Sequence, residues 1–123
     1  MKKILVVDDE PFIVMIVEDK LKNAGYEVLT QRTGRGIVEL VKSSKPDLLI
    51  MDWMLPGENG LDICRKLKKN PETSSIPIFM LTARGQEADE KLCLECGIEQ
   101  YITKPFSPMS LVRLVENTIG RPE

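Results

Sequence analysis

The sequence contains no histidine among its 123 residues. Without an imidazole the chain cannot form a Ser-His-Asp or Cys-His nucleophilic site, and most kinds of zinc site are excluded as well. The longest apolar run covers six residues, from Phe12 to Val17, and is too short to span a membrane. Only four apolar residues stand between Lys3 and Asp8, too few for a secretory signal. Three cysteines, an odd number, do not suit a disulfide framework, so we expect a cytoplasmic protein.

Basic residues are not in surplus, since 17 Lys and Arg stand against 19 Asp and Glu, a formal net charge of −2. We therefore expect no direct binding to nucleic acid. The hydrophobic share of 42% and the charged share of 29% are typical of a folded globular chain. This length predicts a single domain over residues 1–123, with 120–123 as a tail or the start of a linker.

Short apolar runs alternate with helical stripes along the whole chain. Five runs are predicted strands: 4–7, 26–30, 48–51, 78–81 and 101–103. Five segments are predicted helices: 12–24, 37 to about 42, 61–69, 87–96 and 108–119. Ser107 is the expected N-cap of the last helix, with Pro108 at its first position. Strands that alternate with helices need crossover connections, so we predict an α/β fold: a flavodoxin-like, doubly wound (βα)5 with a five-stranded parallel sheet in the order 2-1-3-4-5.

Polar side chains stand where four of the predicted strands end. Asp8 and Asp9 follow the first strand, Asp52 the third, Thr82 the fourth and Lys104 the fifth. The carboxyl ends of parallel strands meet at one edge of the sheet, where open α/β sheets bind ligands. Carboxylates that converge there repel one another unless a cation or a proton lies between them. Oxygen ligands without histidine favour Mg²⁺.

A carboxylate beside Mg²⁺, an ammonium and a hydroxyl suits phosphoryl transfer. The carboxylate can act as a nucleophile and form an aspartyl phosphate. The metal and the ammonium then neutralise charge on the phosphoryl oxygens. Asp52, on the predicted middle strand, is the natural nucleophile, and Asp8 and Asp9 would hold the metal.

Four stretches of the chain resemble a response-regulator receiver domain. They are Val6-Val7-Asp8-Asp9-Glu10-Pro11, Asp52-Trp53-Met54-Leu55-Pro56-Gly57 with Gly60, Leu81-Thr82-Ala83, and Tyr101-Ile102-Thr103-Lys104-Pro105-Phe106. They extend from the first strand to the last predicted helix, so the resemblance covers essentially the whole chain. The sequence is also similar to the single-domain chemotaxis receiver, a protein with the same strand order.

The resemblance implies a role for each residue at the strand ends. Asp52 would accept a phosphoryl group from a phosphohistidine on a histidine kinase or phosphotransfer protein. Asp9 and Asp52 would bind Mg²⁺ directly, Asp8 through water, and the Met54 backbone carbonyl would be a further ligand. Lys104 would pair with the phosphoryl oxygens.

The resemblance also implies a conformational switch. Thr82 would move to bond the phosphoryl group, and Tyr101 would rotate inward into the space that Thr82 leaves. A plain edge-strand tyrosine with its hydroxyl in water is the alternative for Tyr101. The Lys104–Pro105 bond is expected to be cis. Output would pass through the fourth helix, fifth strand and fifth helix to a downstream effector protein or an attached output domain, with a phosphorylation-linked homodimer as one form of output.

Two other functions compete with the phospho-accepting switch. A degenerate receiver that only docks would be expected to lack one of the acids, Thr82 or Lys104, and all are present. A small Mg²⁺-dependent aspartyl-phosphate phosphatase would want a second acid two residues after the nucleophile, where Met54 stands. We therefore expect a regulatory domain that catalyses only its own phosphorylation and dephosphorylation, not an enzyme.

Cys93 and Cys96 form a C-x-x-C pair on the predicted fourth helix. A redox pair of this kind is expected at the start of a helix that follows a strand, which is not its place here. With only Cys64 left and no histidine, one chain cannot supply four zinc ligands. We expect these cysteines to pack a helix face.

Overall fold

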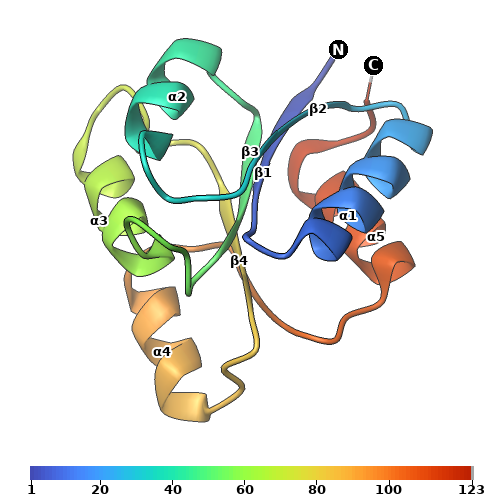
Figure 1. Cartoon of the computed structure of the whole chain (residues 1–123). Helices are drawn as coiled ribbons and strands as arrows, with labels where there is room; N and C mark the ends of the chain where they lie inside the picture. The colour runs from blue at the N-terminus through green and yellow to red at the C-terminus, as the bar shows by residue number, and fades with distance from the viewer. Residues whose placement is uncertain (123) are drawn as a thin grey trace.

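The computed structural model describes residues 1–122 and contains, within them, five strands and five helices that alternate along the chain (Figure 1). The strands are β1 (Lys3–Val7), β2 (Glu27–Gln31), β3 (Leu48–Asp52), β4 (Ile78–Thr82) and β5 (Gln100–Thr103). The helices are α1 (Pro11–Asn23), α2 (Ile37–Ser44), α3 (Gly60–Lys69), α4 (Glu87–Glu95) and α5 (Pro108–Ile119). Each predicted element is found, with bounds that differ by at most two residues. Residue 123, the last of the predicted tail, lies outside the described residues.

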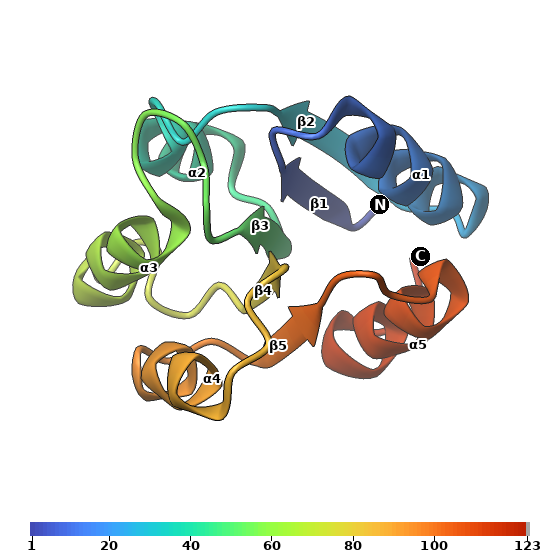
Figure 2. The same cartoon turned by 60° about the horizontal axis from the view of Figure 1, so that its bottom comes forward.

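All five strands form one parallel sheet in the order β2-β1-β3-β4-β5, as predicted. β3 lies in the middle of the sheet between β1 and β4. Figure 2 turns the bottom of Figure 1 toward the viewer. Because the strands are parallel, the residues that follow β1, β3, β4 and β5 gather at the same edge of the sheet.

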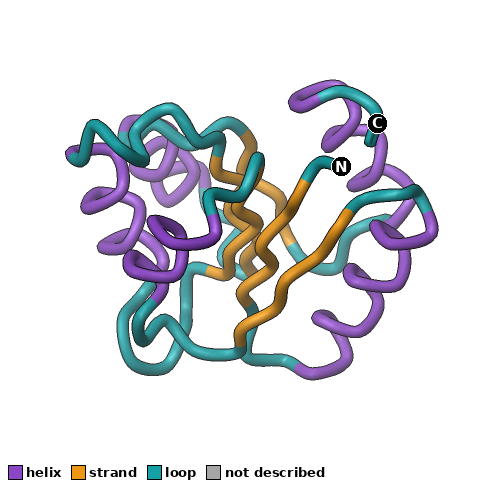
Figure 3. The backbone as a smooth tube through the Cα atoms, turned by 90° about the horizontal axis from the view of Figure 1, so that it is seen from above, coloured by secondary structure: helices purple, strands orange, loops and turns teal. Residues whose placement is uncertain are grey.

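Side chains alternate between the two faces of the sheet, and each face has its own core. Leu5, Leu49 and Met80 belong to the core under α2, α3 and α4. Ile50 and Phe79 belong to the core under α1 and α5. Figures 1 and 3 show these two groups of helices on opposite sides of the sheet. Burial on both faces explains why the strands are almost entirely apolar.

Two helix starts position the chain around the sheet edge. The Ser107 side chain accepts a hydrogen bond from the Ser110 N–H at 3.2 Å, which confirms the predicted N-cap of α5. The Asn59 side chain caps α3 in the same way, by accepting from the Asp62 N–H at 3.0 Å. At Gly60, the first residue of α3, a Cβ would lie 2.4 Å from the Asp52 carbonyl oxygen. Only glycine lets α3 begin so close to the end of β3.

The first residues of the chain and the end of α5 lie near one another (Figures 1 and 2). The Lys2 ammonium donates to the Ile119 carbonyl oxygen there. Across residues 1–122, none of the helices combines the length and the apolar character needed to cross a membrane.

Candidate functional site

Four acidic side chains meet at the carboxyl edge of the sheet. Asp8 and Asp9 directly follow β1, Glu10 comes next, and Asp52 is the last residue of β3. One carboxylate oxygen from each lies within 4.8 Å of the others. Asp8 and Asp52 are buried, whereas Asp9 and Glu10 are exposed. The structure thus brings together the three predicted aspartates and adds a glutamate.

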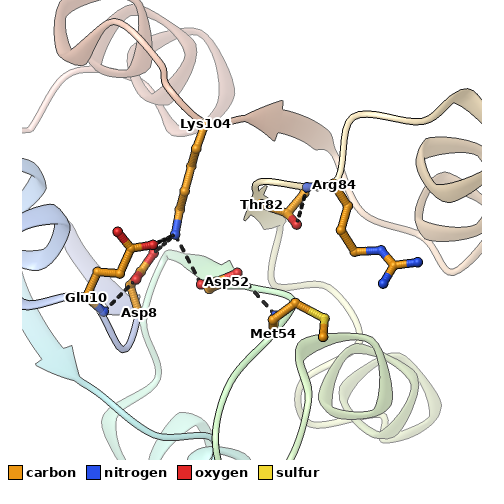
Figure 4. A network of polar contacts seen from close by, with 7 residues as sticks. All are labelled: Asp8, Glu10, Asp52, Met54, Thr82, Arg84 and Lys104. Carbon is orange, nitrogen blue, oxygen red and sulfur yellow. Dashed lines mark hydrogen bonds and ion pairs between the residues drawn. The ribbon is translucent and has the colours of Figure 1, made fainter.

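Lys104 lies among these acids and comes from the loop after β5 (Figure 4). Its ammonium nitrogen is 2.8 Å from Asp8 Oδ2, 3.0 Å from Glu10 Oε1 and 3.1 Å from Asp52 Oδ2. Only 10% of the Lys104 side chain is exposed, so its ion pairs with the buried Asp8 and Asp52 are largely shielded from water. The Lys104–Pro105 bond that follows is cis, as predicted.

The backbone orients both buried carboxylates in the same way. Asp8 Oδ1 accepts a hydrogen bond from the Glu10 N–H at 2.9 Å, and Asp52 Oδ1 accepts from the Met54 N–H at 3.1 Å. In each case the second oxygen is left to face Lys104. The contact of Lys104 with Asp8 Oδ2 is close but poorly directed, so this buried oxygen has charge pairing without a well-formed hydrogen bond.

Burial and charge shift the titration of these groups. Burial raises the pKa of Asp8, against the opposing effect of Lys104 and the Glu10 N–H. Burial raises the pKa of Asp52 as well, and the neighbouring Asp8 charge raises it further. Burial alone would lower the pKa of Lys104, but its contacts with Asp8, Glu10 and Asp52 raise it above the ordinary value.

The charge balance of the cluster fits a hard cation. Four carboxylates face one ammonium, and a buried oxygen of Asp8 lacks a directed donor. A divalent cation would relieve the repulsion between the carboxylates and would give the Asp8 oxygen a partner. The donors are all oxygens, the set that Mg²⁺ prefers. Met54, whose backbone carbonyl the resemblance to receiver domains implies as a further ligand, follows Asp52 by two residues and has an exposed side chain.

The backbone of Arg84 links two further predicted residues. Thr82, fully buried at the end of β4, accepts a hydrogen bond on Oγ1 from the Arg84 N–H at 3.1 Å. Tyr101, half-buried on β5, donates its hydroxyl to the Arg84 carbonyl oxygen. The alternative, a tyrosine whose hydroxyl contacts only water, therefore does not describe Tyr101. Burial raises the pKa of Tyr101 to about 12.

The Arg84 side chain points away from the acids (Figure 4). Its guanidinium bonds Asp89, with nitrogen–oxygen distances of 3.1 and 3.3 Å, and lies 4.7 Å from the centre of the Trp53 ring. Trp53 follows Asp52 and is only 7% exposed. These contacts tie the loop after β3 to the first turn of α4.

The contact of Glu10 with Lys104 and the hydrogen bonds of Arg84 were not predicted from the sequence. Glu10 is an exposed acid at the start of a helix, where acids are common for reasons unrelated to a site. Its one usable signal was its place directly after two aspartates. The bonds of Arg84 depend on how a loop folds back on α4, which spacing alone does not reveal.

The sequence matches the family model of the response regulator receiver domain over residues 4–116. It is 43% identical over 120 residues to the phosphate regulon transcriptional regulatory protein PhoB of Pseudomonas aeruginosa. That alignment covers 98% of this chain and 52% of PhoB, so the chain spans about half the length of this curated relative.

Solved structures agree with this match. The chemotaxis response regulator CheY4 of Vibrio cholerae superposes with a TM-score of 0.88 at 28% identity, over 96% of this chain and 98% of that one. The receiver domain of the sensor histidine kinase PA1611 of Pseudomonas aeruginosa, which has a magnesium ion coordinated in its active site cleft, gives 0.87 at 30% identity, over 97% and 98%. Since the family match runs from β1 into α5, the chain belongs to the response regulator receiver domain family of two-component signalling.

Proposed function

We propose that this receiver domain is a phospho-accepting switch whose acceptor is Asp52. The observation that carries the proposal is the position of Asp52, buried on the central strand with one oxygen 3.1 Å from the Lys104 ammonium and in reach of the other acids. A carboxylate there is held in place, partly desolvated and next to a positive charge. These are the conditions that phosphoryl transfer requires of an acceptor.

In the proposed reaction an Asp52 oxygen attacks the phosphorus of a phosphohistidine. The new P–O bond forms as the P–N bond breaks, and the imidazole nitrogen leaves with the electron pair. Lys104 is placed to balance charge on the transferred phosphoryl oxygens. Asp9 and Asp52 would hold Mg²⁺ directly, Asp8 would hold it through water, and the Met54 carbonyl would be a further ligand; the bound ion would supply positive charge against the phosphoryl oxygens.

The proposed switch passes through Thr82 and Tyr101. A phosphoryl group on Asp52 would offer the Thr82 hydroxyl a stronger acceptor, and the hydroxyl would move away from the Arg84 N–H. The carbonyl oxygen of Arg84 accepts a hydrogen bond from the Tyr101 hydroxyl. A shift of the loop that contains Arg84 would therefore change the position of Tyr101. This coupling supports output through α4, β5 and α5.

The proposed partners are a histidine kinase or phosphotransfer protein as donor and a downstream effector or attached output domain as receiver of the signal. PhoB is described as a transcriptional regulator, and this chain corresponds to about half of it. PA1611 is a sensor histidine kinase that carries a receiver of its own. We propose a regulatory role in the cytoplasm rather than turnover of an external substrate.

Trp53 fluorescence tests the proposal, because this residue is adjacent to Asp52 and is covered by Arg84. The wild type, Asp52→Asn and the control Asp19→Asn are titrated with Mg²⁺ and then given acetyl phosphate. Asp19 is an exposed aspartate on α1, away from the cluster. We expect a Mg²⁺-dependent change and then a second change with the donor, which Asp52→Asn alone loses.

Other outcomes separate the alternatives. A metal response without the donor step would require a radiolabel transfer assay from a phosphorylated kinase, and labelling that persists in Asp52→Asn would refute the acceptor assignment. No response to metal or donor would favour a receiver that acts only by docking. Sustained turnover of a phosphomonoester would favour a phosphatase.

A further inference from the structure

Two cysteines meet far from the acidic cluster. Cys64 lies on α3, and Cys96 directly follows the last residue of α4. Their sulfur atoms are 3.3 Å apart although the residues are 32 positions apart in the sequence, and both thiols are free. The Cys64 thiol also points toward the Cys96 carbonyl oxygen, at 3.8 Å. One side chain therefore reaches the other with little movement.

The two thiols differ in their access to solvent. Cys64 is fully buried, whereas Cys96 is only half-buried and lines a surface hollow of about 410 Å³. The cationic residues Arg65, Lys68 and Lys69 line the same hollow, with Glu95 as its one acid. Positive charge around the thiol attracts anions. The hollow thus offers an accessible thiol in surroundings that suit a small anionic reagent.

We propose that Cys96 is a modification site for small anionic disulfides, and that Cys64 resolves the product into an intrachain Cys64–Cys96 disulfide. This goes beyond the phospho-accepting function and uses none of the residues at the strand ends. It also departs from the sequence-based expectation that the cysteines only pack a helix face.

The exchange consists of two balanced steps. In the first, the Cys96 thiolate attacks one sulfur of a disulfide RSSR, an S–S bond forms between Cys96 and one R–S group, and RS⁻ leaves. In the second, the Cys64 sulfur attacks Cys96 Sγ, the second RS⁻ leaves, and the intrachain S–S bond forms. The two cysteines lose two electrons in total, and RSSR gains them. The protons of the two thiols end on two RSH molecules.

Burial explains why Cys96 acts first. Burial raises the pKa of Cys64, and the neighbouring Cys96 sulfur raises it further. The sulfur of Cys64 is held next to its target, and such proximity offsets its low reactivity.

The C-x-x-C spacing would instead pair Cys96 with Cys93. Cys93 is fully buried among the core residues under α4, and burial raises its pKa to about 11. The sulfur in contact with Cys96 is that of Cys64. The structure therefore favours a partner that the sequence spacing does not indicate.

The disulfide would join the end of α4 to the middle of α3. Within α4 only the Cys93 side chain is buried, so this helix has few other attachments to the core. The proposed output surface includes α4, and the bond would restrict its carboxyl-terminal end. In a reducing compartment such a bond is reversible, which suits regulation rather than permanent stabilisation.

The test treats the fully reduced protein with oxidised glutathione, an anionic disulfide, and follows it by thiol titration and non-reducing peptide mapping. We expect loss of two of the three free thiols and a Cys64–Cys96 cross-linked peptide without retained glutathione. Cys64→Ala should stop at a stable mixed disulfide on Cys96. Cys93→Ala is the matched control and should still close the bond.

The charge of the reagent tests the role of the hollow. Rates with oxidised glutathione and with cystamine, a cationic disulfide, are each divided by the rate of the same reagent with free N-acetylcysteine. We expect the normalised rate to be on the order of tenfold higher for glutathione, with the difference shrinking in high salt. A Cys93–Cys96 bond, a wild-type protein that keeps all its thiols, or equal normalised rates would each overturn the proposal as stated.

Discussion

At the scale of single residues, Lys104 balances the buried charge of the site. Its ammonium contacts Asp8, Glu10 and Asp52, and the first and last of these are buried. Removing one partner of a buried ion pair typically costs about 3–5 kcal/mol, because the other charge is left without compensation. We expect Lys104→Met to lower the free energy of unfolding by about 3 kcal/mol in magnesium-free buffer, measured by urea denaturation.

Lys22→Met is the matched control for that substitution. Lys22 pairs with Glu18 at 2.9 Å on α1, but its side chain is 56% exposed and that of Glu18 is 32% exposed. Exposed pairs of this kind contribute about 0.5 kcal/mol or less. If the two variants lost equal stability, the shielded position of Lys104 would have no energetic consequence.

Tyr101 links stability to alkaline pH. Its pKa is about 12 in the folded chain, above the ordinary value of 10.0, mainly because of burial. The folded state therefore retains the phenolic proton more strongly than the unfolded state does. The stability that this provides is fully present below pH 10.0 and is lost as the pH rises through about 12.

We therefore expect the wild type to be more stable than Tyr101→Phe at neutral pH, by about 1 kcal/mol for the hydrogen bond to the Arg84 carbonyl. This advantage should shrink as the pH rises from 10.0 toward 12. Urea denaturation of both proteins across this range measures it. Parallel pH profiles for the two proteins would mean that Tyr101 titrates alike in the folded and unfolded states.

At the scale of secondary-structure elements, much of the molecule could be predicted. The apolar runs of the strands are buried on both faces, so their pattern is strong, and their ends place Asp52 and Thr82 without any knowledge of side-chain contacts. The N-cap of α5 was also readable, because Ser107 and Pro108 each have a specific role at a helix start.

Contacts between distant elements could not be predicted. The Cys64–Cys96 contact depends on how α3 and α4 are placed side by side, and C-x-x-C spacing pointed to a different partner for Cys96. The bond from Tyr101 to the Arg84 carbonyl depends on the path of one loop. Local sequence patterns carry no information on either, since each contact is set by tertiary packing.

The helices are attached to the sheet unequally, and α4 is attached least. It buries one side chain, that of Cys93, whereas α3 buries Leu61, Ile63, Cys64 and Leu67. Local opening is easiest where few apolar groups are buried. We expect amide hydrogens of α4 to exchange about tenfold or more faster than those of α3 in native-state hydrogen exchange read by mass spectrometry.

The comparison uses the reduced protein, so that no cross-link between α3 and α4 contributes. α5 and α1 provide an internal reference, because these two helices are similar in length and each buries three residues. Equal protection of α4 and α3 would show that helix attachment does not follow burial in this chain.

At the scale of the whole molecule, folding brings together acids that the unfolded chain keeps apart. β1 and β3 are neighbours in the sheet, and this pairing places Asp8 and Asp9 beside Asp52. The repulsion between these carboxylates is therefore a property of the folded state. A cation that binds them stabilises the folded state only, by an amount that depends on its concentration relative to the dissociation constant.

We accordingly expect Mg²⁺ at 100 times its dissociation constant to raise the free energy of unfolding by about 2.7 kcal/mol, and a chelator to reverse the effect. Asp9→Asn should lose this stabilisation while it folds normally, because Asp9 is exposed. Asp19→Asn, a change at another exposed aspartate, which lies on α1, should keep it. Sodium chloride at matched ionic strength separates specific binding from screening, since screening weakens repulsion in every variant alike. If the salt stabilised the chain as much as Mg²⁺ does, or if Asp9→Asn responded like the wild type, the acids at the sheet edge would not form a metal site.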